Sequence, residues 1–165
     1  MGLLNFLKKR KQPEQKSYPL TKPEVMDLVT DVCSALGLQY RMLENCGIGA
    51  PPLFKKNSDN DEAAIDLWLA GYISGFYDAS SQCRGVSFEL NALELIFSVL
   101  YNEHDAEFAI REYHIARMSL ESDRAAAVLF GYDEFEEGML AGGNEVYDWA
   151  NNLTDPPFKL YKKYS

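Results

Sequence analysis

The clearest pattern of hydrophobic and polar positions lies between residues 132 and 152 of the chain. When this segment is placed on a helix, its side chains separate into two faces. The apolar face contains Phe135, Met139, Val146, Trp149 and Ala150, together with Gly138 and Gly142. The other face contains five carboxylates: Asp133, Glu134, Glu137, Glu145 and Asp148. The pattern therefore predicts an amphipathic helix over residues 132–152 with an exposed acidic face.

Apolar residues recur with the helical period through most of the remaining chain, without the alternating β-branched runs of strands. Helices are expected from a cap at Thr21 to an end at Gly37, then over residues 38–46, 61–80, 88–103 and 106–120, and in a short segment ending near Gly131. Segment 88–103 is apolar around most of its circumference, so we expect it at the centre of the core. The predicted fold class is all-α, a single-domain bundle of six or seven helices.

The segments outside these helices have different expected roles. Residues 1–20 are predicted to form a basic, flexible N-terminal arm, and residues 21–165 a single helical domain. A loop is expected over residues 47–60, which contain two adjacent prolines. The tail from Leu153 contains Pro156 and Pro157, which cannot continue a helix, so we expect it to pack as an extended strap.

Small residues cover one side of the segment 61–80, where Gly71 and Gly75 are four positions apart. Glycine inside a helix costs about 1 kcal/mol relative to alanine, so a packing reason is expected. We predict that both glycines lie at a close contact between two helices.

Charge narrows the possible partners. The 165 residues carry a formal net charge of −9. Residues 1–22 are nevertheless rich in Lys and Arg, and three lysines lie within residues 159–163, so the body between them is strongly acidic. Such a body repels nucleic-acid phosphates and attracts a basic protein partner. No apolar run is long enough to cross a membrane, so stable membrane insertion is not expected.

Cys33, Cys46 and Cys83 cannot all pair within one chain and do not have metal-ligand spacing. A reducing compartment, the cytoplasm, is therefore expected. The opening residues place their bases after a short apolar run, which is the wrong order for a secretory signal.

No catalytic or cofactor motif is present in the sequence. His104 and His114 have no partners at ligand spacing, and no phosphate-binding loop or nucleophile elbow occurs. We therefore expect no cofactor, no metal and no enzymatic activity. Two alternatives remain open: an enzyme of unrecognised type that uses Asp, Glu and Tyr, and a helical scaffold or oligomer subunit that uses the glycine-rich face between chains.

The carboxylates of segment 132–152 are the candidate partner-binding residues. No Lys, Arg or His occurs between positions 125 and 157, so no sequence neighbour neutralises these acids. A plain solvated surface and a shared-proton or cation site are the alternatives. Tyr132, Tyr147 and Trp149 border the acidic face and are the expected aromatic anchors of an interface.

The chain opens with MGLLNFLKKRK, and its body is small, acidic and free of catalytic motifs. In these features it resembles the immunity proteins of bacterial polymorphic-toxin and contact-delivered effector systems. The resemblance implies an antitoxin that blocks a cognate toxin, such as a basic nuclease, by direct binding. It covers the opening residues and the general composition, so it assigns no functional residue.

Overall fold

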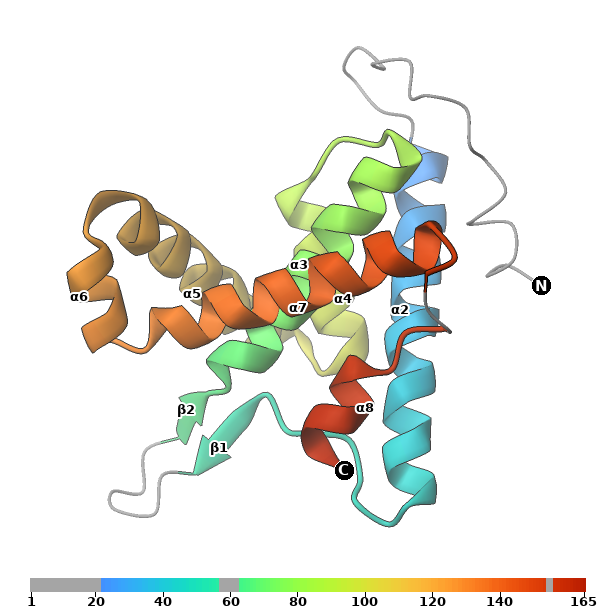
Figure 1. Cartoon of the computed structure of the whole chain (residues 1–165), viewed down its shortest axis with the longest axis horizontal. Helices are drawn as coiled ribbons and strands as arrows, with labels where there is room; N and C mark the ends of the chain where they lie inside the picture. Colours follow the sequence, from blue (N-terminus) through green and yellow to red (C-terminus); the bar gives the residue numbers. More distant parts are fainter. Residues whose placement is uncertain (1–21, 57–62, 154–155) are drawn as a thin grey trace.

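The computed structural model describes residues 22–56, 63–153 and 156–165, in which seven helices and one two-stranded antiparallel sheet are found. The predicted all-α fold class is confirmed (Figure 1). The predicted N-terminal arm and the cap at Thr21 lie outside the described residues. The helices are α2 (Lys22–Asn45), α3 (Leu67–Arg84), α4 (Leu90–Leu100), α5 (Glu103–Ser122), α6 (Arg124–Leu129), α7 (Tyr132–Ala150) and α8 (Lys159–Tyr164), and the strands are β1 (Phe54–Lys56) and β2 (Ala63–Ile65).

Helix α3 is the most deeply buried element of the described chain. Every residue from Trp68 to Ser81 except Asp78 is buried. Residues 88–103 were expected at the centre of the core. The helix found there, α4, is shorter than predicted, and only four of its residues are buried. The expectation was wrong because α3 combines large aromatic side chains with small residues, and therefore packs against neighbours on several sides (Figure 1).

The contact between α3 and α7 depends on four glycines. A Cβ atom at Gly71 or Gly75 would lie closer than 3.0 Å to backbone atoms of α7, and one at Gly138 or Gly142 would lie as close to the backbone of α3. The two helices therefore touch backbone to backbone, which no other residue type allows. The predicted close contact at Gly71 and Gly75 is confirmed. The glycine-rich face is buried inside one chain, so it is not free to join two chains as the scaffold alternative requires.

Helix α2 does not end at Gly37, in contrast to the prediction. It continues to Asn45 because Tyr40 and Leu43 extend the buried face that begins with Leu28. Nothing lies within 4 Å of the Cβ position at Gly37. The helical cost of one glycine is small compared with the burial of these side chains.

The start of α3 also differs from the prediction. Residues 63–65 form strand β2, which pairs with β1 in the segment predicted as a loop, so the helix does not begin near residue 61. Asp66 instead caps α3 by accepting a hydrogen bond from the backbone N–H of Leu69 at 3.1 Å. Lys55 of β1 lies 2.5 Å from the same carboxylate, so the strand pair and the cap stabilise each other.

Candidate functional site

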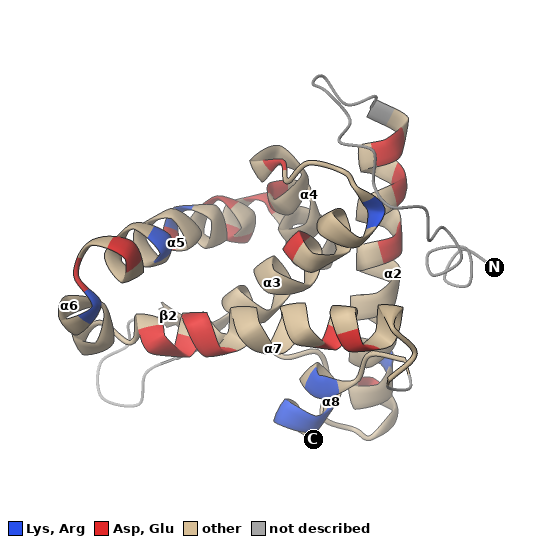
Figure 2. Ribbon diagram, turned by 45° about the horizontal axis from the view of Figure 1, so that its top comes forward, with Lys and Arg blue, Asp and Glu red and all other residues tan. Residues whose placement is uncertain are grey.

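Helix α7 carries the candidate site, and its bounds agree with the prediction to within two residues. Asp133, Glu134 and Glu137 are exposed near its N-terminal end, and Asp148 is half-buried near its C-terminal end. Figure 2 shows the acidic positions of α7 in two groups, one beside α6 and one toward the C-terminal end of the helix. In the first group, Asp133, Glu134 and Glu137 form a continuous exposed cluster, which we call the α7 acidic face.

Glu145 is not part of this face, and the expectation that it is exposed was wrong. Its relative exposure is 4%. The carboxylate accepts hydrogen bonds from the backbone N–H groups of Phe158 at 2.7 Å and Lys159 at 2.8 Å, and from the hydroxyl of Tyr72. Glu145 thus satisfies donors at the N-terminus of α8, where a negative charge is favourable.

The tail beyond Leu153 ends in helix α8 instead of an extended strap, and this corrects a second expectation. Gln39 of α2 accepts a hydrogen bond from the backbone N–H of Tyr161 at 3.2 Å. Its amide also donates to the hydroxyl of Tyr72 at 2.9 Å. Burial raises the pKa of Tyr72 well above its usual value, and the neighbouring Glu145 raises it further. The phenol therefore stays protonated and donates to the carboxylate.

The aromatic residues expected at the border of the acidic face lie elsewhere. Tyr132 and Trp149 are buried, with relative exposures of 9% and 8%. The hydroxyl of Tyr132 donates to Glu112 at 3.2 Å. Trp149 follows Gly138 and Gly142 along the side of α7 that packs on α3. Tyr147 keeps an exposed edge of 38%, so it is the aromatic residue of this group that a partner can reach.

Two bases outside residues 125–157 lie close to an acid of α7 or to a residue that binds one. Arg124 of α6 forms a two-point ion pair with Glu136, with N–O distances of 2.6 and 3.2 Å. Lys163 of α8 lies 4.9 Å from the centre of the Trp68 ring, and the indole N–H of Trp68 donates to Glu137 at 3.2 Å. Within the described parts of the chain, no Lys or Arg lies within ion-pair distance of Asp133, Glu134 or Glu137, although Arg124 also interacts electrostatically with Asp133.

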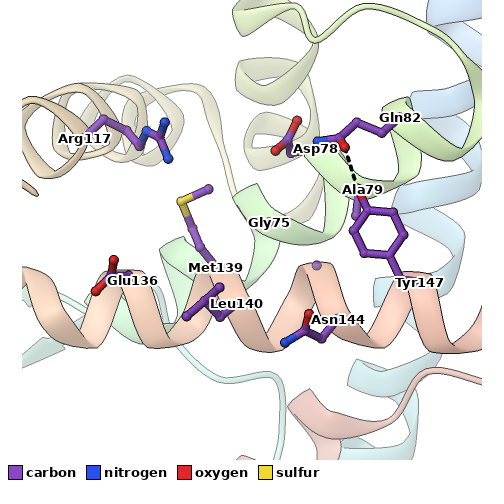
Figure 3. A pocket seen from close by; sticks show the side chains of 11 residues that line it. Gly75, Asp78, Ala79, Gln82, Arg117, Glu136, Met139, Leu140, Asn144 and Tyr147 are labelled. Atoms are coloured by element: carbon purple, nitrogen blue, oxygen red, sulfur yellow. Dashed lines mark hydrogen bonds between the residues drawn. The ribbon is translucent and has the colours of Figure 1, made fainter. Parts of the chain in front are cut away.

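A pocket of about 250 Å³ opens between α3, α5 and α7 (Figure 3). The sequence did not predict it, since its walls come from three helices. The hydroxyl of Tyr147 donates to Gln82 at 2.5 Å and closes one end. The lining consists of Gly75, Asp78, Ala79 and Gln82 from α3, Arg117 from α5, and Glu136, Met139, Leu140, Gly143, Asn144 and Tyr147 from α7.

A second group of polar side chains surrounds Asp66, which is buried. Its carboxylate binds Lys55 and accepts a hydrogen bond from Tyr164 at 2.7 Å. Tyr40 and Tyr101 share a hydrogen bond nearby, and Tyr101 also donates to the carbonyl oxygen of Pro51 at 3.2 Å. Burial raises the pKa of all three tyrosines. They therefore act as hydrogen-bond donors: Tyr40 and Tyr101 join α2 to the residue that follows α4, and Tyr164 joins α8 to the start of α3.

The histidines lie against aromatic rings. The ring of His104 is 5.0 Å from that of Phe108, and the ring of His114 is 5.9 Å from that of Tyr113. Within residues 22–56, 63–153 and 156–165, no three His, Cys, Asp or Glu side chains are grouped so that they could hold a metal ion. The described helices are too short or too polar to span a lipid bilayer.

Comparison with known proteins adds no relative from which a role could be transferred. The chain matches no protein-family model, and neither a curated protein nor a solved structure is detectably similar to it.

Proposed function

We propose that this chain is a non-enzymatic binding protein that neutralises a basic protein, in the manner of an immunity protein that blocks a toxin, by direct contact through the α7 acidic face. The observation that supports the proposal is the set of three exposed carboxylates, Asp133, Glu134 and Glu137, on adjacent turns of one helix. No described Lys or Arg lies within ion-pair distance of them, and Arg124, which interacts electrostatically with Asp133, is itself paired with Glu136. In the proposal the chain acts in the cytoplasm, does not bind nucleic acid and needs no cofactor.

The physical reason is electrostatic steering. Exposed ion pairs contribute about 0–1 kcal/mol each, so three acids alone give little affinity. Their summed field nevertheless raises the rate at which a basic partner arrives, and salt screens this field. Rapid association is the property that a protein needs in order to block a toxin before it acts.

The packing of α7 also supports this role. The helix is fixed to α3 by backbone contact at four glycines, so its acids are held on a rigid element. A surface that is already ordered loses less conformational entropy when a partner binds.

The test is a charge reversal on the α7 acidic face. We expect Asp133→Lys, Glu134→Lys and Glu137→Lys together to slow association with the basic protein that co-purifies from the native host by about tenfold or more at low salt. The control reverses three exposed acids on other helices, Glu44, Glu103 and Glu107, which changes the net charge by the same amount. Equal association rates for the two triple variants would contradict the proposal, because the location of the acids would then not matter.

A further inference from the structure

The pocket between α3, α5 and α7 is large enough to hold one or two side chains of another protein. Its volume of about 250 Å³ lies below the range of roughly 300–1,000 Å³ that is typical of sites for small molecules. Met139 and Leu140 supply apolar surface, and Leu140 has a relative exposure of 59%. The space therefore suits one or two side chains of a protein better than a complete substrate.

Three charged side chains line the pocket, and two of them form ion pairs with residues outside it. Glu136 is paired with Arg124, and Arg117 lies 3.2 Å from Glu121. Asp78 projects from α3 on the side of the pocket opposite Arg117 (Figure 3). Among the described residues, no ion pair or hydrogen bond involves its carboxylate, although the side chain is half-buried. A half-buried carboxylate without a partner is a favourable place for a cation.

The pocket and the α7 acidic face are neighbours on one helix. At about 100° per residue, Leu140 and Asn144 of the pocket lie within about 20° of Asp133 when α7 is viewed along its axis. A protein that contacts the acids can therefore reach the pocket without a second binding surface.

We infer that the pocket receives one Arg or Lys side chain of the basic partner, with its aliphatic part over Met139 and Leu140 and its charge at Asp78. The inference depends on the proposed function for the identity of the partner. The burial of one cationic side chain at the centre of a surface steered by exposed acids is typical of an interface hot spot.

The first experiment uses N-acetyl-arginine amide as a probe and follows the backbone amide signals of the ¹⁵N-labelled full chain by NMR. The signals of Gly143 and Tyr147 should shift as the probe is added. N-acetyl-citrulline amide, which has the same shape without the charge, should shift them far less. Equal shifts with both compounds, or no shift with either, would overturn the inference.

Two variants test separately the charge of Asp78 and the space inside the pocket. Asp78→Asn should weaken binding of the arginine probe by about tenfold, while Asp148→Asn, outside the pocket, should change it by less than about twofold. A Cβ atom at Gly143 would have its nearest neighbours at 3.7 and 3.9 Å, which is ordinary van der Waals contact, so Gly143→Ala should fit against α3, reduce the space in the pocket and weaken binding of the probe. Unchanged affinity for the probe in either pocket variant would contradict the inference.

The same variants distinguish failure of the inference from failure of the proposed function. If the partner still depends on the α7 acidic face but the probe does not bind, the inference is wrong and the proposed function stands. If the probe binds at Asp78 but reversal of the α7 acids does not slow the partner, the proposed function is wrong. With both correct, Asp78→Asn should speed dissociation of the partner, whereas the α7 reversal should slow association.

Discussion

At the scale of single residues, two helical glycines of this chain have opposite surroundings. Gly75 lies against the backbone of Met139, whereas the Cβ position at Gly37 is open. We expect Gly75→Ala to lower the free energy of unfolding by about 1–3 kcal/mol, because the added methyl group overlaps a carbonyl that cannot move without moving α7. Gly37→Ala should raise it by about 0.5–1 kcal/mol, because alanine favours the helix. Urea unfolding of both variants tests the pair, and changes of the same sign would contradict it.

The carboxylate of Glu145 is a second single group with a wide effect, because it binds the first backbone amides of helix α8. From the sequence, Glu145 was expected on the exposed acidic face of 132–152. Its burial depends on α8, which begins fourteen residues later at Lys159 and folds back onto α7. No local pattern indicates such a contact, because the donors are backbone N–H groups and any residue supplies them.

At the scale of elements, Glu145 provides the hydrogen bonds that hold the start of α8. Glu145→Ala should release α8 and increase hydrogen exchange at the amides of residues 158–164, because the amides of Phe158 and Lys159, which begin the helix, lose their acceptor on α7. The free energy of unfolding should fall by about 1–3 kcal/mol. Asp148→Ala is the control, since its carboxylate makes no hydrogen bond to α8. Unchanged exchange in residues 158–164 would show that other contacts are enough to hold the helix.

The elements show where sequence reasoning succeeds. Helix α7 was predicted closely because its apolar and acidic positions separate over five turns and Gly131 precedes it. The end predicted at Gly37 was wrong because buried side chains on both sides of the glycine belong to one face, and tertiary packing overrides a local end signal. Strand β2 was missed because three residues are too few to show a period.

At the scale of the whole molecule, the buried phenols make the fold sensitive to alkaline pH. Burial raises the pKa of Tyr72, Tyr101 and Tyr164 above the usual value of 10.0, and that of Cys33 from 9.0 to about 11. Because these groups are held neutral in the folded chain but ionise in the unfolded chain, their contribution to stability is complete below about pH 9 and is lost as the pH rises.

We therefore expect the chain to unfold cooperatively above about pH 10, with the phenolate absorbance of the buried tyrosines and the loss of helical circular dichroism changing together. Chemical denaturation at several pH values should show the free energy of unfolding falling as the pH rises from 9 to 11. If tyrosines titrate gradually while the helical signal stays constant, their hydroxyls are accessible to solvent and this prediction fails.

The candidate site was only partly predictable at this scale. The exposed carboxylates Asp133, Glu134 and Glu137 follow from the helical period of one segment. The approach of Lys163 to Trp68 and the pocket beside Asp78 require helices that are distant in sequence to be placed side by side, whereas the ion pair of Glu136 with Arg124 joins two consecutive helices. The pocket and the Lys163 contact depend on the packing of distant segments, and the Glu136–Arg124 pair depends on the turn between the consecutive helices α6 and α7, neither of which a single sequence specifies.

The four glycines between α3 and α7 also determine how the two helices can move. Gly71 faces Phe135 and Gly75 faces Met139, so the contacts advance in the same direction along both helices. A slide of α7 by one helical turn, about 5.4 Å, would bring Glu134 or Val146 to a position held by a glycine, where a Cβ atom would overlap the backbone of α3. Only one relative position of α3 and α7 along their axes therefore keeps all four glycines at the close contacts. Asp78 on α3 and the acids on α7 therefore keep a constant separation. A partner that contacts both groups of acids meets the same spacing in every copy of the chain.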